Sequence, residues 1–229
     1  GNATWQTPVA DGDGSSTNEL QTLSISGNDV TLSNGGGTVS IPAAWGLTGN
    51  SGTVDGTHFI GTTDDKPLNF QVNGEKAGRI ETDAYSGSNN ANTAYGYRTL
   101  NSNTTGNSNT ANGSNALYSN TTGGGNTAIG TAALYSNTTG GGNTAIGNAA
   151  LYFNTSGGGN TANGVTALRK NTTGNENTAN GYAALRDNTT GYDNTANGSQ
   201  ALLLNTTGYD NNAYGAQALF FNTTGYSNN

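Results

Sequence analysis

Short apolar segments recur along residues 92–229 with a fixed period of seventeen residues. As a frame, the period reads N-T-A-x-G-x-x-A-L-x-x-N-T-T-G-x-x. It begins at Asn92, Asn109, Asn126, Asn143, Asn160, Asn177, Asn194 and Asn211, with a ninth start at Asn228. Each period holds two segments of small or apolar residues, closed by a Gly or by Asn-Thr-Thr-Gly, that are too short for helices. The pattern predicts two short strands and two turns per period, which is one coil of a parallel β-roll or β-solenoid.

The eight complete periods follow one another without insertion or deletion. Each coil is therefore expected to stack in register on the last, at a spacing of about 4.8 Å, which gives a rod of roughly 40 Å. Two columns of asparagine, at the first and twelfth positions of the frame, are candidate hydrogen-bonded ladders. The invariant glycines are expected to supply positive φ angles at corners. In one period, the residues assigned to this framework are Asn126, Ala128, Gly130, Leu134, Asn137 and Gly140.

The region before the repeats shows a different pattern, in which apolar and polar residues alternate between turn signals. Alternation from Leu20 to Ile41, broken at 27–29 and 34–37, predicts a small β-meander. Asn73-Gly74 is a strong hairpin turn signal within a second β-rich stretch. The predicted fold is all-β, divided into a polar leader (1–19), a β-meander stalk segment (20–44), a β-rich connector (45–91) and the β-roll repeats (92–229).

The predicted core is thin. One Leu and two Ala per period offer little apolar area against a backbone ordering cost of about 1 to 2 kcal/mol per residue. Oligomerisation is the usual remedy for a small core, so we expect a homotrimer whose subunits share the burial.

Composition and charge exclude several classes of protein. The chain has no cysteine, so no disulfide framework or thiolate metal site is expected. Residues 1–91 hold ten acidic and three basic residues, whereas the repeats hold four of each sign. Without a basic stripe, nucleic acid is not an expected partner. No signal peptide and no apolar run long enough to span a membrane is found, so we expect no membrane insertion by this segment.

Candidate catalytic and metal-binding residues are few. Asp11-Gly-Asp13-Gly-Ser15 resembles the start of a calcium loop, but Ser16 and Thr22 stand where that loop needs Gly and Glu, which favours a solvated acidic turn. His58, the only histidine, has Asp55 and others nearby in sequence, yet a structural role is expected for a lone strand histidine. We therefore expect no enzyme activity, no cofactor and no metal.

Variable positions of the frame are where recognition is expected. The sixteenth and seventeenth positions change from Gly-Gly to Tyr-Asp or Tyr-Ser toward the C-terminal end, at Tyr192, Asp193, Tyr209, Asp210 and Tyr226. Stacked tyrosines beside carboxylates could offer flat faces and hydrogen-bonding edges to a glycan. The alternative is an ordinary turn column whose rings pack on one another.

The tenth and eleventh positions form a second variable column, which we assign to the subunit interface because exposed apolar pairs are a liability on a monomer. The residues assigned are Tyr118, Tyr135, Tyr152, Leu203, Leu204, Phe220 and Phe221. Arg169 and Arg186 lie in the same column and need carboxylates or solvent, and Asp187 is the nearest acidic residue.

The repeats, with NTAIG at 126–130 and 143–147, resemble the NSVAIG-type head repeats of trimeric autotransporter adhesins of the YadA kind. That resemblance implies a left-handed parallel β-roll assembled as a homotrimer. The period departs from the family, being seventeen rather than the usual fourteen residues, and so does the second half, which reads NTTG. The longer repeat and the segments 18–33 and 45–80 are similar to bacterial and phage tail-fibre-domain proteins.

These observations favour a structural and adhesive segment of an extracellular trimeric fibre, on a bacterial surface or a virion, that presents a binding surface for a cell-surface glycan or host receptor. An ice-binding β-solenoid that uses ranks of threonine such as Thr93, Thr110 and Thr127 is the alternative. A glycan-hydrolysing fibre with carboxylates from neighbouring chains is a lower alternative. The absence of an initiating methionine, and an end two residues into a repeat, indicate a processed product or part of a longer protein.

Overall fold

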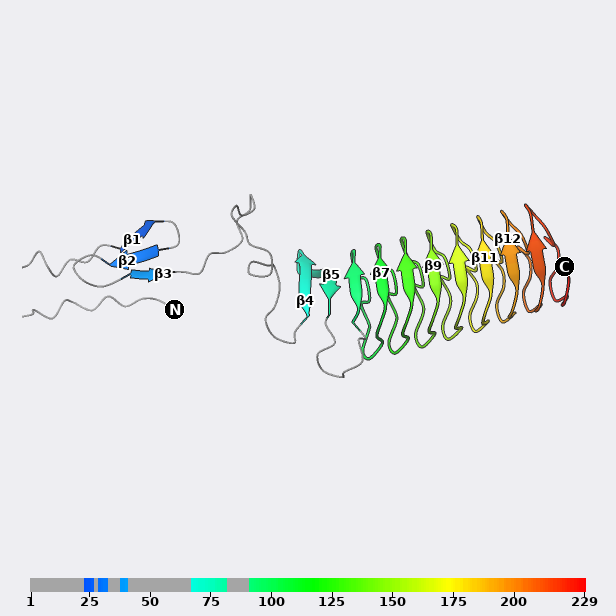
Figure 1. Ribbon diagram of the computed structural model, residues 1–229, viewed down its shortest axis with the longest axis horizontal. Helices are drawn as coiled ribbons and strands as arrows, with labels where there is room; N and C mark the ends of the chain where they lie inside the picture. The colour runs from blue at the N-terminus through cyan, green and yellow to red at the C-terminus, as the bar shows by residue number, and fades with distance from the viewer. Residues whose placement is uncertain (1–22, 27–28, 33–37, 41–66, 82–90) are drawn as a thin grey trace, which may run out of the picture. The chain divides into compact units, whose positions relative to one another are not determined.

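The computed structural model describes residues 23–26, 29–32, 38–40, 67–81 and 91–229 and is all-β there, with no helix (Figure 1). The chain divides into two compact units, Gly1–Ile60 and Gly61–Asn229. The first unit contains β1 (Leu23–Ser26), β2 (Asp29–Leu32) and β3 (Thr38–Ser40). These strands pair antiparallel in the order β1-β2-β3, which confirms the predicted β-meander.

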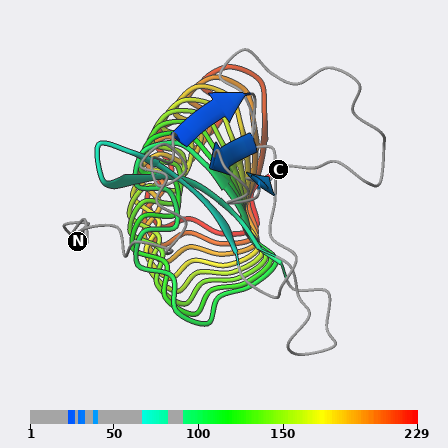
Figure 2. The ribbon, with the colours of Figure 1, turned by 90° about the vertical axis from the view of Figure 1, so that its left-hand side faces the viewer.

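The second unit is a β-solenoid in which every period contributes one three-residue strand. The strands are β6 (Thr93–Tyr95), β7 (Thr110–Asn112), β8 (Thr127–Ile129), β9 (Thr144–Ile146), β10 (Thr161–Asn163), β11 (Thr178–Asn180), β12 (Thr195–Asn197) and β13 (Asn212–Tyr214). All neighbouring pairs are parallel, and each residue faces the one seventeen positions later. The coils therefore nearly superimpose when viewed along the stack (Figure 2).

The prediction of two strands per coil was wrong, because the Ala-Leu segment turns instead of extending. The seventh and ninth positions both adopt left-handed backbone conformations. In one coil these residues are Ala132, with φ 57°, and Leu134, with φ 52°. This conformation costs a non-glycine residue about 1 to 2 kcal/mol. The segment still bonds from coil to coil, since Leu134 N donates to Ala150 O at 3.0 Å. Backbone pairing between coils thus continues outside the strands.

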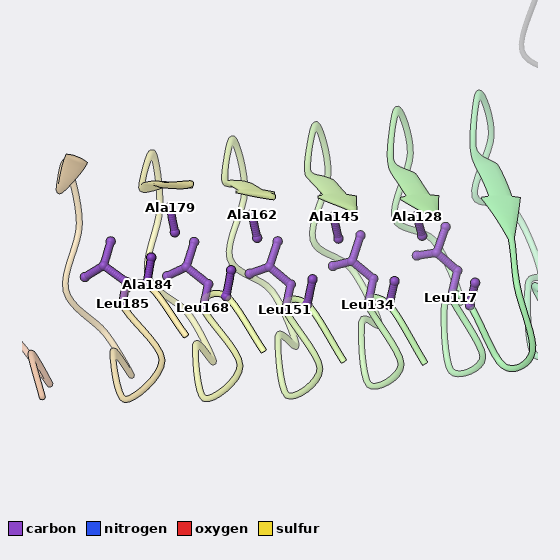
Figure 3. Close-up of a cluster of buried hydrophobic side chains, with 14 of the residues drawn as sticks. Leu117, Ala128, Leu134, Ala145, Leu151, Ala162, Leu168, Ala179, Ala184 and Leu185 are labelled. Carbon is purple, nitrogen blue, oxygen red and sulfur yellow. The ribbon is translucent and has the colours of Figure 1, made fainter. Parts of the chain in front are cut away.

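The core is closed within a single chain. Leucines at the ninth position and alanines at the third and eighth positions point into the coil and form one continuous row (Figure 3). Leu134, Ala128 and Ala133 are each 0% exposed. Burial of the Leu and Ala columns therefore does not require other subunits, although we expected them to share it.

Both predicted asparagine ladders are present, and they supply the polar half of the core. Asn137 Nδ2 donates to Asn120 Oδ1 at 2.7 Å, and Asn126 Nδ2 donates to Asn109 Oδ1 at 3.1 Å. Both amides also donate to the carbonyl oxygen of Gly140, at 2.9 Å each. Asn126 and Asn137 are 0% exposed, so these bonds satisfy amide groups that would otherwise be buried without partners.

The invariant glycines at the fifth and fifteenth positions are both required by the close approach of neighbouring coils, since a Cβ on Gly130 would lie 2.7 Å from backbone atoms of Gly147. At the fifth position they adopt positive φ, as predicted, with values such as 128° at Gly130. At the fifteenth position that prediction was wrong. A Cβ on Gly140 would instead collide with Gly157 O and Asn137 Oδ1, so glycine is required there by the close approach of the two coils.

A hairpin precedes the first coil and belongs to the same sheet. It consists of β4 (Leu68–Val72) and β5 (Glu75–Ile80), and β5 pairs antiparallel with β6. Asn73 and Gly74 both have positive φ, 51° and 76°, which confirms the predicted tight turn. One ion pair and one side-chain hydrogen bond attach this region to the first coil. Arg98 Nη2 lies 3.1 Å from Glu75 Oε1, and Asn92 Nδ2 donates to Glu81 Oε2 at 2.6 Å.

The close contact at the fifteenth position generates a first prediction. Gly140→Ala is expected to lower the free energy of unfolding by about 3 kcal/mol, because the added methyl group meets backbone and a buried amide. Gly142→Ala is the matched control. Its φ is 68° and the nearest atom is Gly159 N at 3.8 Å, so only the left-handed penalty of about 1 kcal/mol applies. Urea denaturation followed by circular dichroism measures both, and equal losses would contradict the role assigned to Gly140.

The ladder geometry generates a second prediction. Asn137→Asp replaces a donor by an acceptor that faces Gly140 O and Asn120 Oδ1. The buried aspartate should have a raised pKa, because both burial and these acceptors disfavour its charged form. The variant is therefore expected to be most stable below about pH 4, the unfolded pKa, and to lose about 3 to 5 kcal/mol of stability relative to the parent by neutral pH.

Asn163→Asp is the control for this pH dependence, because Asn163 lies at the exposed end of β10. Its unfolding free energy should stay within about 0.5 kcal/mol of the parent across the same range. Thermal melts of the two variants at acid and neutral pH measure the difference. If Asn137→Asp were as stable at neutral pH as at pH 3, the donor role of Asn137 would be wrong.

Candidate functional site

Each variable position of the frame becomes a row along the solenoid, because residue i of one coil lies beside residue i+17 of the next. The rows at the tenth, eleventh, sixteenth and seventeenth positions follow directly from this register. Residues far apart in the sequence are thereby brought into single lines of side chains. Candidate recognition surfaces are therefore rows, and the geometry of each row decides what it can bind.

The row of Tyr192, Tyr209 and Tyr226 is a stack of parallel rings. The ring centroids are 4.9 Å and 5.1 Å apart, with interplanar angles of 5° and 4°. Tyr192 is 43% exposed, Tyr226 is 62% exposed and Tyr209 between them is half-buried. Asp193 and Asp210 lie beside the rings, exposed, each at φ 53°.

This stacking limits the flat ring surface that the row can offer to a glycan. Both faces of Tyr209 are covered by its neighbours, so a sugar ring cannot stack on it. What the row presents along its length is ring edges and hydroxyl groups. Desolvation, the adjacent Tyr209 and the carboxylates of Asp210 and Asp193 raise the pKa of the Tyr192 phenol, which therefore remains a protonated donor at neutral pH.

The tenth position forms a second aromatic stack, which continues into a cationic side chain. Tyr118, Tyr135 and Tyr152 stack at 5.0 Å and 4.9 Å, with interplanar angles of 4° and 2°. The guanidinium of Arg169 lies in the next coil, 5.6 Å from the Tyr152 ring centroid and 5.2 Å from that of Phe153. These distances are those of cation–π contacts.

The structure covers most of the row that the sequence assigned to a subunit interface. The tyrosines are half-buried by their own stacking, Leu203 is only 4% exposed, and Leu204 and Phe220 are half-buried. Of the residues assigned to the interface, Phe221 is the most exposed, at 81%, with its ring 4.9 Å from that of Phe220. An interface role for this row remains a prediction, and it has less free apolar surface than expected.

Sequence reasoning missed a more exposed apolar surface, on either side of the glycine corner at the fifth position. We call the outward side chains of the fourth and sixth positions the corner stripe. Its exposed apolar members, between 38% and 71% exposed, are Tyr95, Tyr97, Ile129, Ile146, Val165, Tyr182 and Tyr214. The stripe carries no charged residue in any of the eight coils. The absence of charge at both positions was a signal available in the sequence.

A basic cluster lies beside the second aromatic stack. Arg186 makes a two-pronged contact with Asp187, Nε to Oδ1 at 2.8 Å and Nη2 to Oδ2 at 2.9 Å. Lys170 Nζ lies 3.1 Å from the same Oδ1. The expectation that Asp187 would serve the arginines is therefore confirmed for Arg186, while Arg169 rests on aromatic rings instead. The hydrogen bond from Arg186 lowers the pKa of Asp187, so this carboxylate is ionised at neutral pH.

Two further sequence hypotheses, the acidic turn at Asp11 and Asp13 and the lone His58, lie outside the described residues. Within the described ranges, no group of three His, Cys, Asp or Glu side chains is arranged to hold a metal ion. No helix suited to crossing a membrane occurs in that part of the chain.

Comparison of the chain with protein-family models, with curated proteins and with solved structures finds no significant match. The resemblance to autotransporter heads and tail-fibre-domain proteins therefore rests on the sequence motifs alone.

The aromatic stacks generate a third prediction. In a double-mutant cycle, Tyr135→Ala and Tyr152→Ala should show a coupling energy of about 0.5 to 1.5 kcal/mol, because their rings stack at 4.9 Å. Tyr135→Ala combined with Tyr209→Ala provides the control, since Tyr209 belongs to the other stack, and its coupling should be below about 0.5 kcal/mol. Urea denaturation of the parent, the three single variants and the two double variants measures both couplings. Equal coupling in the two cycles would contradict direct stacking.

Proposed function

We propose that this chain is the adhesive segment of an extracellular trimeric fibre, of a bacterial surface or a virion, that spaces and presents a binding surface. The observation that carries the proposal is the division of each coil into an invariant interior and a variable exterior. Asn, Ala, Leu and Gly hold every coil in one register, while the outward positions differ from coil to coil. A stiff rod with a patterned surface is the form that a spacer and a presenter both need.

The corner stripe is the surface best suited to contacts between subunits. Subunit interfaces are depleted of charge at their centres and enriched in Tyr and other aromatic residues. The stripe is uncharged along the whole solenoid, and it carries aromatic residues in the first, sixth and eighth coils. The tenth and eleventh positions fit less well, because Arg169, Lys170, Arg186 and Asp187 interrupt them. We therefore move the proposed trimer contact to the stripe.

A cell-surface glycan or host receptor is the proposed partner, bound on rows that the trimer leaves open. The rows of Tyr hydroxyls, carboxylates and guanidinium groups offer donors and acceptors at the coil spacing. A repeating ligand such as a saccharide chain matches a repeating surface, because several weak contacts then act together. We propose no catalytic role, and the hydrolytic alternative would require acidic residues brought together from separate chains.

Ice binding is the second candidate, supported by the register of the threonine rank. Thr110, Thr127 and Thr144 face one another across successive parallel strands, which gives a regular line of hydroxyl and methyl groups. The neighbouring fourth position, however, mixes Tyr, Asn and Ile, so the line is one residue wide. Thermal hysteresis in a freezing-point measurement would favour this function over the fibre.

The trimer generates a fourth prediction. Light scattering at micromolar concentration should give a mass near three times the chain mass of 23.0 kDa. The double variant Ile129→Lys and Ile146→Lys should give a folded monomer, because both side chains are exposed on one chain, at 40% and 38%, yet would place charges in the contact.

The matched control adds two lysines to neighbouring coils on another exposed row, Thr139→Lys and Ser156→Lys, and should remain trimeric. A parent protein that is monomeric would overturn the trimer. A parent trimer that survives in the stripe variant would overturn only the choice of surface.

A further inference from the structure

The basic cluster is the one place in the solenoid where positive charge accumulates. The part of the chain that the structure describes contains six Lys and Arg side chains, and three of them, Arg169, Lys170 and Arg186, lie in two adjacent coils. Lys170 and Arg186 share a single carboxylate, Asp187. The repeats as a whole hold four basic and four acidic residues, so the cluster is a local excess of cations in a neutral solenoid.

The cations elsewhere in the described ranges are already occupied. Arg79 pairs with Glu81, and Arg98 pairs with Glu75. Lys76 Nζ donates to Leu100 O at 3.2 Å. Arg169 differs from all of these, because no carboxylate and no hydrogen-bond acceptor among the described residues contacts its guanidinium. Its planar donors are therefore available to a ligand.

Aromatic contacts hold this guanidinium in place. Arg169 lies over both Tyr152 and Phe153, whose rings are 4.6 Å apart and nearly perpendicular. A guanidinium positioned in this way loses little side-chain entropy when it binds an anion. Phe153 is 40% exposed and leaves an apolar surface directly beside the charge.

We propose that Arg169, with Lys170 and Arg186, binds the anionic group of an acidic oligosaccharide, a carboxylate or a sulfate, with the sugar ring lying against Phe153. This inference rests on the proposed glycan-binding role and names its chemical class. Guanidinium groups bind both anions through paired hydrogen bonds. The hydroxyl groups of Tyr118, Tyr135 and Tyr152, in the same row as Arg169, supply neutral partners for sugar hydroxyl groups.

The surroundings favour a short acidic saccharide over nucleic acid. Three cations, two of them paired with the carboxylate of Asp187, can neutralise one or two anionic groups, whereas nucleic acid needs a run of phosphate contacts. Outside this cluster the repeats hold one cation, Arg98, and three carboxylates, Glu176, Asp193 and Asp210, so a long polyanion meets more repulsion than attraction there. A saccharide that carries isolated charges between neutral hydroxyl groups avoids that repulsion.

Calorimetric titration of the whole chain with three probes tests the proposal. Trigalacturonate and maltotriose sulfate carry the two anion types, and the methyl ester of trigalacturonate is the neutral match. Binding of either anionic probe, at least about tenfold tighter than that of the ester, is the expected result. Equal binding of the ester, or binding of neither anionic probe, would overturn the proposal. Tighter binding of a thymidine oligonucleotide would also overturn it.

Variants then locate the site. Arg169→Gln should weaken the anionic probe about tenfold, and Arg169→Lys should recover only part of that loss, because lysine keeps the charge but not the paired donors. Asp187→Asn should bind about threefold more tightly, because it removes the competing carboxylate. Asn107→Asp is the control for net charge. Like Arg169→Gln, it lowers the net charge by one unit, but at an exposed position on another coil. It should therefore bind the anionic probe as the parent does.

A variant set in which Arg169→Gln and Asn107→Asp weaken binding equally would show that only net charge matters. Melting curves on the same samples distinguish lost binding from lost folding, and Arg169→Lys serves if Arg169→Gln melts early. Failure of anion binding leaves the solution mass untouched, so this inference can fail while the proposed trimeric rod stands. Binding of the neutral ester alone would likewise keep a glycan-binding rod and remove the acidic specificity.

Discussion

Two buried asparagine amides meet at one glycine carbonyl in each coil, and the rest of the solenoid depends on this contact. Gly140 O accepts from Asn126 and from Asn137, fourteen and three residues before it. A buried amide that lost this acceptor would carry an uncompensated desolvation cost. An insertion or deletion of one residue between Asn126 and Gly140 would break these hydrogen bonds in that coil. It would also shift the coil out of register with both neighbouring coils. The constant period of seventeen is therefore a hydrogen-bonding requirement as well as a packing one.

The same contact explains how so small an apolar core holds the coils. Leucine and alanine fill only the part of the coil near the strand, and the asparagine ladders complete the interior. Each ladder amide bonds to its own coil and to the preceding one, so closure of a coil and stacking of coils are coupled. The left-handed leucines are tolerated for this reason, because the surrounding bonds outweigh the strain of each.

An interior that admits no change leaves the exterior as the only place where function can vary. The exterior is divided by charge. The corner stripe is uncharged in every coil and suits contact between copies, whereas the cluster at Arg169 combines cations with aromatic rings and suits an anionic ligand. The two surfaces lie at different positions of the frame, so the proposed trimer contact and the proposed anion site use different side chains. This arrangement supports reading the chain as a rod that carries a local site.

The sequence by itself determined the period, the parallel register, the asparagine ladders, the meander and the turn at Asn73-Gly74, because each follows from spacing or from local backbone preference. Only the tertiary structure decided that each coil has one strand, that Gly140 is required by the neighbouring coil, that the faces of Tyr209 are covered and that Arg169 rests on rings. These features depend on contacts between coils at atomic distances. A one-dimensional pattern shows which residues share a row, but the packing of that row decides which of their atoms remain free.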